Sequence, residues 1–184
     1  MKKVIVFVAL FLFVTAQNVF AQTPISLSIT PTPAPTTTQY QLAYPGILPD
    51  SPLYPLKAIR DRIVLFFIND PAEKAKFELL VADKHLSAAI SLLAERPPKP
   101  ALAQSSVAKG ENYFEDAISS AKLAKSNGQN IGTLVDILSS SLDKHTQVLT
   151  GMEETIAPPY KDSIVKSLSR VMQFREILMT LRTK

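Results

Sequence analysis

The 184-residue chain contains no cysteine, no tryptophan and only two histidines. Without cysteine it has no disulfides, no thiolate metal sites and no thiol for catalysis or lipid attachment. Glycine is also scarce, with five residues, which suits a helical protein better than one built from many tight turns. The fold must rest on an apolar core, and this length allows one ordinary domain with accessory segments.

The chain also lacks a large excess of charge of either sign. The formal net charge is +4, from twenty Lys and Arg against sixteen Asp and Glu, and Lys2 and Lys3 supply two of the positive charges. This balance lacks the concentrated basic face that nucleic-acid binding requires. We therefore expect no nucleic-acid partner.

The N-terminus has the pattern of a secretory signal. Lys2 and Lys3 precede an apolar run over residues 4–16, and small residues stand at the −3 and −1 positions of a cleavage site before Gln22. The run is shorter than the about 20 residues of a membrane-spanning helix. We predict a signal peptide over residues 1–21, with an uncleaved anchor as the alternative. Either way the remainder lies outside the cytoplasm, secreted or tethered by its N-terminal segment.

A Thr/Pro-rich segment follows. No charged residue occurs between Lys3 and Asp50, and half of residues 22–41 are Thr or Pro. Because proline lacks a donor and Thr disfavours helix, we predict a disordered linker over residues 22–43 that samples extended polyproline II states. The alternative is a stalk that holds the next domain away from a membrane or wall, with its Thr residues as candidates for glycosylation.

Prolines divide residues 44–184 into helical segments. Asp50 or Ser51 before Pro52 is typical of a helix start, and so is Asp70 before Pro71. We expect helices over about residues 52–68, 71–95, 101–126 and 131–156, and a fifth from about residue 160 onward, after Pro158 and Pro159 have ended the fourth. Short breaks between such helices predict an all-α fold, an antiparallel bundle of four to five helices.

Apolar residues within the helices recur at spacings of three and four, as in a heptad seam. The seam of the second helix is rich in alanine (Ala75, Ala82, Ala89), so a neighbouring helix can approach closely. The most regular seam belongs to the fourth helix: Ile131, Val135, Leu138, Leu142, His145, Leu149, Met152 and Ile156. The fifth helix carries Ile164, Leu168, Val171, Met172, Leu178 and Met179.

Two runs of residues resemble a known family. L-P-D-S-P-L-Y-P-L-K-x-x-x-D-R over residues 48–62 and N-D-P-A-E-K-A-K-F-E-L over residues 69–79 are similar to bacterial domain of unknown function 5667. Its matching region begins L-P-x-x-x-L-Y-P-L-K and continues through two predicted helices. The resemblance covers residues 44–93, and beyond them extends only to helical character. It implies an exported or membrane-tethered helical domain and implies no activity.

The first predicted helix contains an apolar run, residues 63–68. A helix that is apolar on every face is typically buried, here centrally or under the proline-rich segment before it. The alternative is an exposed patch that contacts a membrane or a partner, with Ile63, Phe66 and Phe67 as contact residues and Arg60 and Arg62 suited to anionic headgroups. The β-branched and aromatic content also allows a short strand.

The last helix is basic and amphipathic, and Arg170 and Arg175 are its candidate membrane or partner contacts. Lys and Arg are also favoured near helix C-termini and on a solvated helix face. Since Arg175 falls on the seam side, it can also pair with an acid or extend its head group to solvent.

His145 occupies a seam position of the fourth helix, one heptad before Met152. Extracytoplasmic bundles bind haem or copper through such residues, which leaves a small-ligand or metal site open. Two ligands seven residues apart on one helix are separated by about 10 Å, too far to share an ion. A buried, hydrogen-bonded histidine is the alternative.

The sequence contains no catalytic set. Adjacent carboxylates such as Glu153 and Glu154 point about 100° apart on a helix and cannot share a proton. No nucleophile elbow, H-E-x-x-H, P-loop or dinucleotide fingerprint is present. We therefore predict a non-enzymatic protein without cofactor that binds or scaffolds another protein or envelope component. The alternatives are a small-ligand or metal binder using His145 and the methionines, and a membrane-surface protein. No oligomeric state follows from the sequence.

Overall fold

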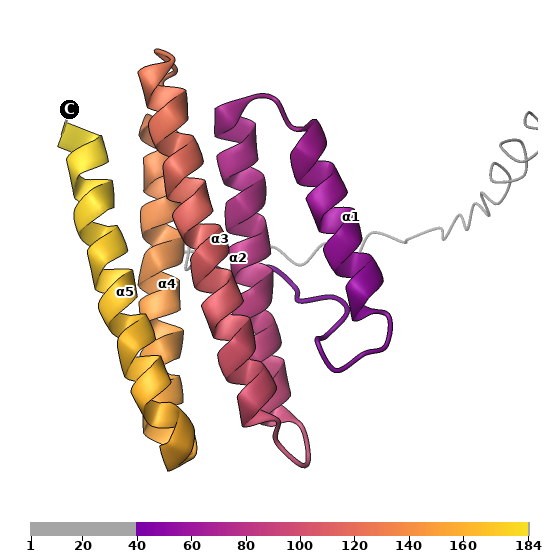
Figure 1. Cartoon of the computed structure of the whole chain (residues 1–184). Helices are drawn as coiled ribbons and strands as arrows, with labels where there is room; N and C mark the ends of the chain where they lie inside the picture. Colours follow the sequence, from indigo (N-terminus) through magenta and orange to yellow (C-terminus); the bar gives the residue numbers. More distant parts are fainter. Residues whose placement is uncertain (1–39, 184) are drawn as a thin grey trace, which may run out of the picture. The chain divides into compact units, whose positions relative to one another are not determined.

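The computed structural model describes residues 40–183, which are largely helical and contain no strand. The helices in this range are α1 (Tyr54–Phe67), α2 (Pro71–Ala94), α3 (Pro100–Ser126), α4 (Gly132–Thr155) and α5 (Pro158–Thr183) (Figure 1). The predicted all-α fold is confirmed, and the reading of residues 63–68 as a strand is wrong. The predicted signal segment and residues 22–39 of the predicted linker lie outside the described residues.

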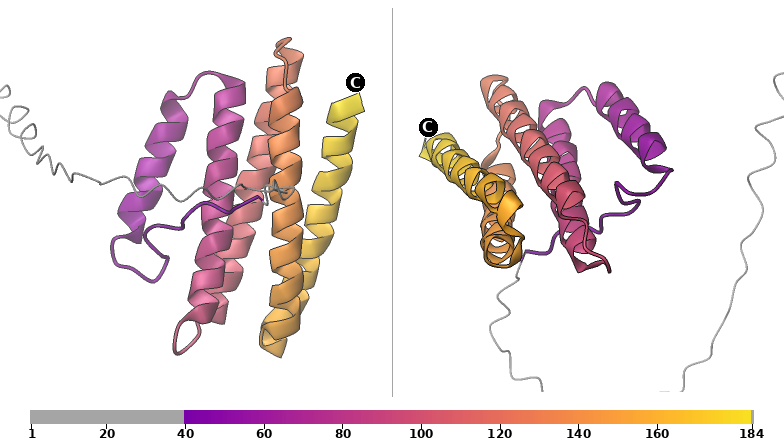
Figure 2. Two further views of the ribbon diagram at one scale, coloured as in Figure 1. Left: turned by 180° about the vertical axis from the view of Figure 1, so that it is seen from behind. Right: turned by 60° about the horizontal axis from the view of Figure 1, so that its bottom comes forward.

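Helices α2 to α5 form an antiparallel bundle, and α1 lies beside α2 at one edge (Figure 1). Helix α2 packs against α3 and α4, and α5 covers α3 and α4 from the other side. The views in Figure 2 show α1 and α5 at opposite edges. No helix within residues 40–183 combines the length and the apolarity of a membrane span.

Local capping explains where α2 begins. The Asp70 side chain accepts hydrogen bonds from the backbone N–H groups of Ala72 and Glu73, at 2.8 and 2.9 Å, and Pro71 occupies the first helical position. An acceptor before the helix satisfies donors that have no partner inside it, while proline has no donor to satisfy. This start was predicted from the sequence.

Two other helix ends differ from the prediction. Leu53, without a side-chain cap, precedes α1, and the Asp50 carboxylate instead pairs with Lys99 at 2.5 Å. Pro158 and Pro159, which we expected only to end α4, begin α5. The first turn of a helix tolerates proline because its N–H groups are unpaired in any case.

Small residues bring α2 and α3 together. Ala75, Ala82 and Ala89 of the predicted alanine seam are fully buried. At Gly110 of α3, a Cβ atom would lie 3.1 Å from the Ala82 carbonyl oxygen and 3.2 Å from Cβ of His85. The two backbones therefore approach closely at this level of the bundle.

The predicted seam of α4 is buried along its whole length. On α5 the core row runs through Ile164, Val171, Phe174 and Leu178, whereas Met172 and Met179 are exposed. Phe174 stacks on Phe114 of α3 with ring centroids 5.6 Å apart. Phe174, rather than the predicted Met172 and Met179, is thus the central contact of α5 with the bundle.

Residues 40–53, here called the N-terminal arm, lead into α1. Tyr40 donates a hydrogen bond from its hydroxyl to Asp83 of α2 at 2.6 Å, and Leu42 packs against the core. Residues 40–43, which the sequence assigned to the linker, therefore lie on the bundle. Lys57 of α1 donates to the carbonyl oxygen of Pro45 at 3.0 Å, which holds the arm to α1.

Candidate functional site

Helix α1 turns its polar side to the bundle. Its buried residues are Lys57 and Asp61, which are 7% and 6% exposed. The Lys57 ammonium group reaches the carbonyl oxygens of Pro45 and Ile47 in the N-terminal arm, at 3.0 and 3.5 Å. Burial lowers the pKa of Lys57, and the nearby Asp61 carboxylate opposes that shift. The two side chains that α1 buries are therefore charged, and Lys57 bonds to the arm rather than to a helix of the bundle.

The apolar side of α1 faces away from the bundle. Leu56, Ile59, Ile63 and Phe67 recur at spacings of three and four, so they form one row on the helix. We call these four residues, with the adjacent Phe66, the outer row. All five are exposed, and Phe66 and Phe67 reach 81% and 72%. The reading of residues 63–68 as a run buried on all sides is therefore wrong, and the predicted contact residues Ile63, Phe66 and Phe67 lie on the surface.

Arg60 and Arg62 flank the outer row. Successive residues of a helix are rotated by about 100° about its axis, so Arg60 and Arg62 project on opposite sides of the Ile63 side chain. Both are exposed, and Arg60 forms an ion pair of 2.7 Å with Asp61. Because Asp61 is the single acid of α1 and is buried, the exposed charges of this helix are cationic.

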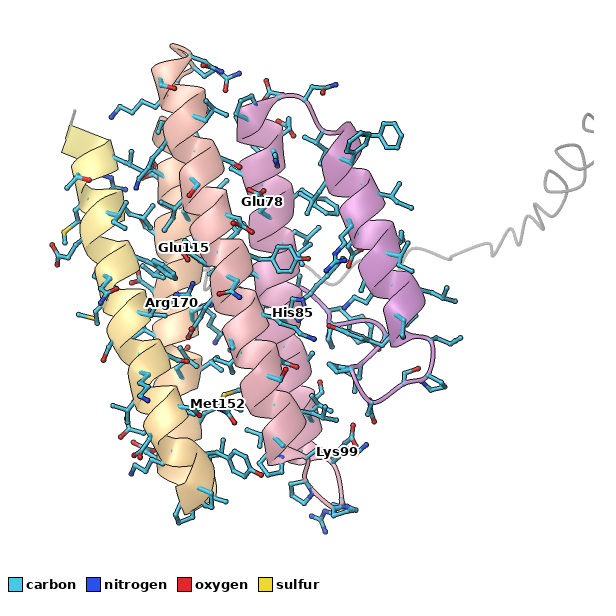
Figure 3. All side chains as sticks on the ribbon, viewed as in Figure 1. Glu78, His85, Lys99, Glu115, Met152 and Arg170 are labelled. Carbon is cyan, nitrogen blue, oxygen red and sulfur yellow. The ribbon has the colours of Figure 1, made fainter. Side chains whose placement is uncertain are left out.

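Arg170 and Arg175 of α5 form ion pairs with neighbouring helices at the surface of the bundle. Arg170 donates to Asn112 at 2.8 Å and contacts Glu115 and Glu111 at 2.5 and 3.4 Å, all on α3. Figure 3 shows Arg170 beside Glu115 in the space between α5 and α3. Burial raises the pKa of Glu111, and Ser167 and Arg170 oppose that shift. Arg170 thus joins two helices.

Arg175 pairs with Asp143 of α4 at 2.7 Å. Asp143 is exposed, so the pair lies at the surface. The two predicted contact residues of α5 are therefore in ion pairs with neighbouring helices, and the structure does not bring them together with the outer row of α1.

A buried polar cluster joins the arm, α2 and α4. Asp83 accepts hydrogen bonds from the Tyr40 hydroxyl at 2.6 Å, from Ser141 Oγ at 2.7 Å and from His145 Nε2 at 3.0 Å. One ring nitrogen of His145 thus lies against a buried acid of the neighbouring helix. Burial and the hydrogen bond to Asp83 raise the pKa of Tyr40. The seam position of His145 is thus explained by a buried acid on α2.

This cluster lacks the geometry of a hydrolase triad. Ser141 and His145 bond to the same oxygen of Asp83, whereas general-base activation requires the histidine between the serine and the acid. Ser141 is also fully buried, so a substrate cannot reach its hydroxyl. The cluster fixes the arm and two helices in place.

The two histidines lie on different sides of α2. His145 reaches Asp83, while His85 stacks on Tyr113 of α3 at 5.5 Å. Within residues 40–183, no three His, Asp or Glu side chains lie close enough to hold a metal ion. Met152, the predicted companion of His145, is buried in the core row of α4. The structure therefore does not assemble a ligand set around His145.

Comparison with known proteins assigns a family. The model of a family described as a domain of unknown function (DUF5667) matches residues 46–158. The chain belongs to this family. No curated protein and no solved structure matches the chain.

The DUF5667 match begins in the N-terminal arm and runs through α1 to α4. It extends well beyond residues 44–93, where the resemblance by motif was predicted. Of the L-Y-P-L-K residues in this range, Lys57 joins the arm to α1 and Leu56 belongs to the outer row. Both the polar and the apolar side of α1 thus lie in the DUF5667 region, whereas Arg170 and Arg175 lie beyond it.

Proposed function

We propose that this DUF5667 protein is a non-enzymatic module that acts outside the cytoplasm and binds the surface of a lipid membrane through the outer row of α1. The observation that carries the proposal is the orientation of α1, with buried Lys57 and Asp61 and an exposed apolar row. Contiguous exposed apolar side chains on one helix are typical of an interaction site.

The charges beside the outer row favour an anionic membrane. An interfacial helix lays its apolar side into the headgroup region and places Lys or Arg along its edges. Arg60 and Arg62 occupy such edges; Arg60 is paired with Asp61, whereas Arg62 has no carboxylate within ion-pair distance among residues 40–183. A protein partner with an apolar groove would fit the row itself, but would not explain the unpaired Arg62 at its edge.

The predicted export signal supports the same location. If residues 1–21 stay as an anchor, they hold the domain near a membrane, which raises the local concentration of the outer row at that surface. If they are cleaved, the outer row would be the means by which the released domain returns to a membrane. The proposal therefore holds for both forms of the N-terminus.

The buried polar cluster supports a binding role rather than an enzymatic one. Its serine and histidine are enclosed by helices, and their hydrogen bonds to Asp83 already use the groups that a reaction would need. In contrast, the outer row is accessible without any change in the fold.

Flotation with vesicles tests the proposal. The chain starting at Gln22, the predicted cleavage product, is mixed with phosphatidylcholine vesicles with and without phosphatidylglycerol. We expect it to float with the anionic vesicles. The change Ile63→Gln should weaken binding at least about tenfold, because burial of an Ile side chain contributes about 1.5–3 kcal/mol.

A matched control separates the outer row from general apolarity. Leu123 of α3 is 53% exposed and Ile63 is 52% exposed, so Leu123→Gln removes a similar apolar area elsewhere and should leave flotation unchanged. Arg62→Gln should weaken binding to anionic vesicles by about fivefold, since each cation near such a surface contributes about 1 kcal/mol. Arg96→Gln, at an exposed arginine outside α1, serves as its control.

Three outcomes would overturn the proposal. The first is that the chain floats with neither kind of vesicle. The second is that Leu123→Gln weakens flotation as much as Ile63→Gln does. The third is self-association in sedimentation that Ile63→Gln abolishes, which would assign the outer row to a second copy of the chain.

A further inference from the structure

A pocket of about 380 Å³ lies between the N-terminal arm, α1 and α2. The arm residues 44–47 line it together with Lys57 and Arg60 of α1 and Lys84 of α2. Figure 1 shows the arm looping past the N-terminal end of α1. We call this the arm pocket. All three charged side chains that line it are cationic, and its volume is at the lower end of the range for ligand sites.

Lys57 shapes one wall of the arm pocket. Its ammonium group donates to the carbonyl oxygens of Pro45 and Ile47, at 3.0 and 3.5 Å, on either side of Gly46. Gly46 has a φ of +69°, a conformation that glycine adopts without steric cost. The arm therefore curves around a buried cation, and Lys57 holds this wall in a defined shape.

The positive charge of the arm pocket exceeds the negative charge beside it. Asp61 is the single acid of α1, and it is paired with Arg60 at 2.7 Å. Among residues 40–183, Lys84 has no carboxylate within ion-pair distance. Burial lowers the pKa of Lys57; Asp61 opposes that shift, whereas the positive charges of Lys84 and Arg60 add to it. Three cations thus lie close together beside one acid, which favours an anionic ligand.

The arm pocket borders the outer row of α1. Arg60 follows Leu56 by four residues and precedes Ile63 by three, so it neighbours both on the helix surface. Its Nε and Nη2 atoms bond to Asp61, and its Nη1 atom has no partner among the described residues. Tyr44 of the pocket wall is 82% exposed, and tyrosine is enriched where a membrane meets water. A lipid whose acyl chains met the outer row would therefore bring its headgroup to the arm pocket.

We propose that the arm pocket binds the phosphate of an anionic phospholipid headgroup, with Lys84 and Arg60 as its contacts and Lys57 as the positioning residue of the arm. This inference rests on the proposed membrane function and names the lipid class involved. A phosphocholine headgroup carries a cation of its own, which the cations of the pocket would repel. A phosphoglycerol headgroup carries none, so phosphatidylglycerol fits the pocket better.

Amide NMR with deacylated headgroups tests the pocket without any acyl chain. The full chain is labelled with ¹⁵N and titrated with glycerophosphoglycerol, with glycerophosphocholine as the zwitterionic analogue and inorganic phosphate as the free anion. We expect glycerophosphoglycerol to cause a saturable shift of the amide of Gly46, which lines the pocket. The amide of Gly151 on α4 should stay unchanged, and glycerophosphocholine should cause no comparable shift.

Matched lysine variants show whether the charge at Lys84 binds the phosphate. Lys84→Gln should weaken glycerophosphoglycerol binding roughly tenfold, as expected for loss of one charge-assisted hydrogen bond. It should also weaken flotation with phosphatidylglycerol vesicles about fivefold, since a cation near an anionic surface is lost. Lys74→Gln, at another partly exposed lysine of α2 that lies outside the pocket, should change neither.

Four outcomes would overturn this inference: no saturable shift of Gly46, equal binding of glycerophosphocholine, equal effects of the two lysine variants, or a shift with inorganic phosphate alone. A Lys84→Gln protein that loses headgroup binding but floats normally would assign the pocket to a soluble phosphate compound instead.

The change Ile63→Gln separates this inference from the proposed function. It should reduce flotation while leaving the glycerophosphoglycerol titration unchanged, because Ile63 lies outside the pocket. Flotation without a headgroup shift would overturn the arm pocket and leave the proposed function in place. A headgroup shift without flotation would overturn the proposed function, and with it the lipid as the source of the phosphate.

Discussion

Helices α1 and α4 are both amphipathic, and they use their apolar sides in opposite ways. The apolar row of α4, with Leu138 and Leu142 at its centre, is fully buried in the bundle. The apolar row of α1 faces solvent, whereas its buried side chains are Lys57, which bonds to the N-terminal arm, and Asp61, which pairs with Arg60. Periodicity therefore identifies a face on each helix, but the neighbours decide whether that face forms the core or remains available for binding.

The largest expected effect comes from making the same kind of truncation on the two helices. Leu142→Ala in α4 should lower the free energy of unfolding by about 3 kcal/mol, because it leaves a cavity in a packed core. Ile63→Ala in α1 should change it by less than about 0.5 kcal/mol, since the side chain is largely solvated. Urea unfolding monitored by circular dichroism measures both values. Equal losses would show that the outer row of α1 is covered in the folded protein.

A second test uses the histidines on the two sides of α2. The pKa of His85 is about 4 in the folded chain and about 6.5 in an unfolded one. Between these values the unfolded state binds a proton that the folded state does not, so stability is retained above about pH 6.5 and lost as the pH falls toward 4. Lys57 and Lys109 add to the downward shift, and Asp61 opposes it.

We expect the free energy of unfolding at about pH 5 to be about 2 kcal/mol lower than at neutral pH because of His85 alone. His85→Phe keeps an aromatic ring beside Tyr113 and removes the titration, so the difference between the two proteins isolates this contribution. The raised pKa values of Glu78 and Glu111 act with the opposite sign and cancel in that difference. A difference that does not change with pH would contradict the prediction.

The smallest expected effect compares two helical glycines. A Cβ atom at Gly151, on the exposed side of α4, meets nothing within 4 Å, so Gly151→Ala should stabilise the protein by about 0.5–1 kcal/mol through helix propensity. Gly110→Ala should instead destabilise it by about 1 kcal/mol, because the Ala82 carbonyl oxygen belongs to the backbone and cannot move aside freely. Thermal unfolding distinguishes the signs. Stabilisation by both changes would mean that α2 and α3 are less closely packed.

The helices could be predicted from the sequence because their signals are local. Asp70 and Pro71 mark the start of α2 within a few residues, and the seam of α4 repeats over almost four heptads. The orientation of α1 could not be predicted in the same way, since it depends on the carbonyl groups of Pro45 and Ile47 that receive Lys57. Those groups become acceptors for Lys57 only when the arm has folded back.

The partner of His145 was also beyond reach of a local pattern. Asp83 lies 62 residues away in the sequence and on another helix. The available signal was the seam position of His145 itself, because a buried ring nitrogen requires a hydrogen-bond partner. A buried His145 needs a hydrogen-bond partner on a facing helix, but several polar residues of α2 and α3 could have provided it equally well.

The hydrogen bond between Tyr40 and Asp83 has a mechanical consequence. A tension applied to the chain from the N-terminal side of Tyr40 would enter the folded domain at Asp83 and pass to α4 through Ser141 and His145. The force is thus transmitted into the interior of the bundle before it reaches α1. Helix α1 and its outer row would remain unloaded until that buried attachment gave way.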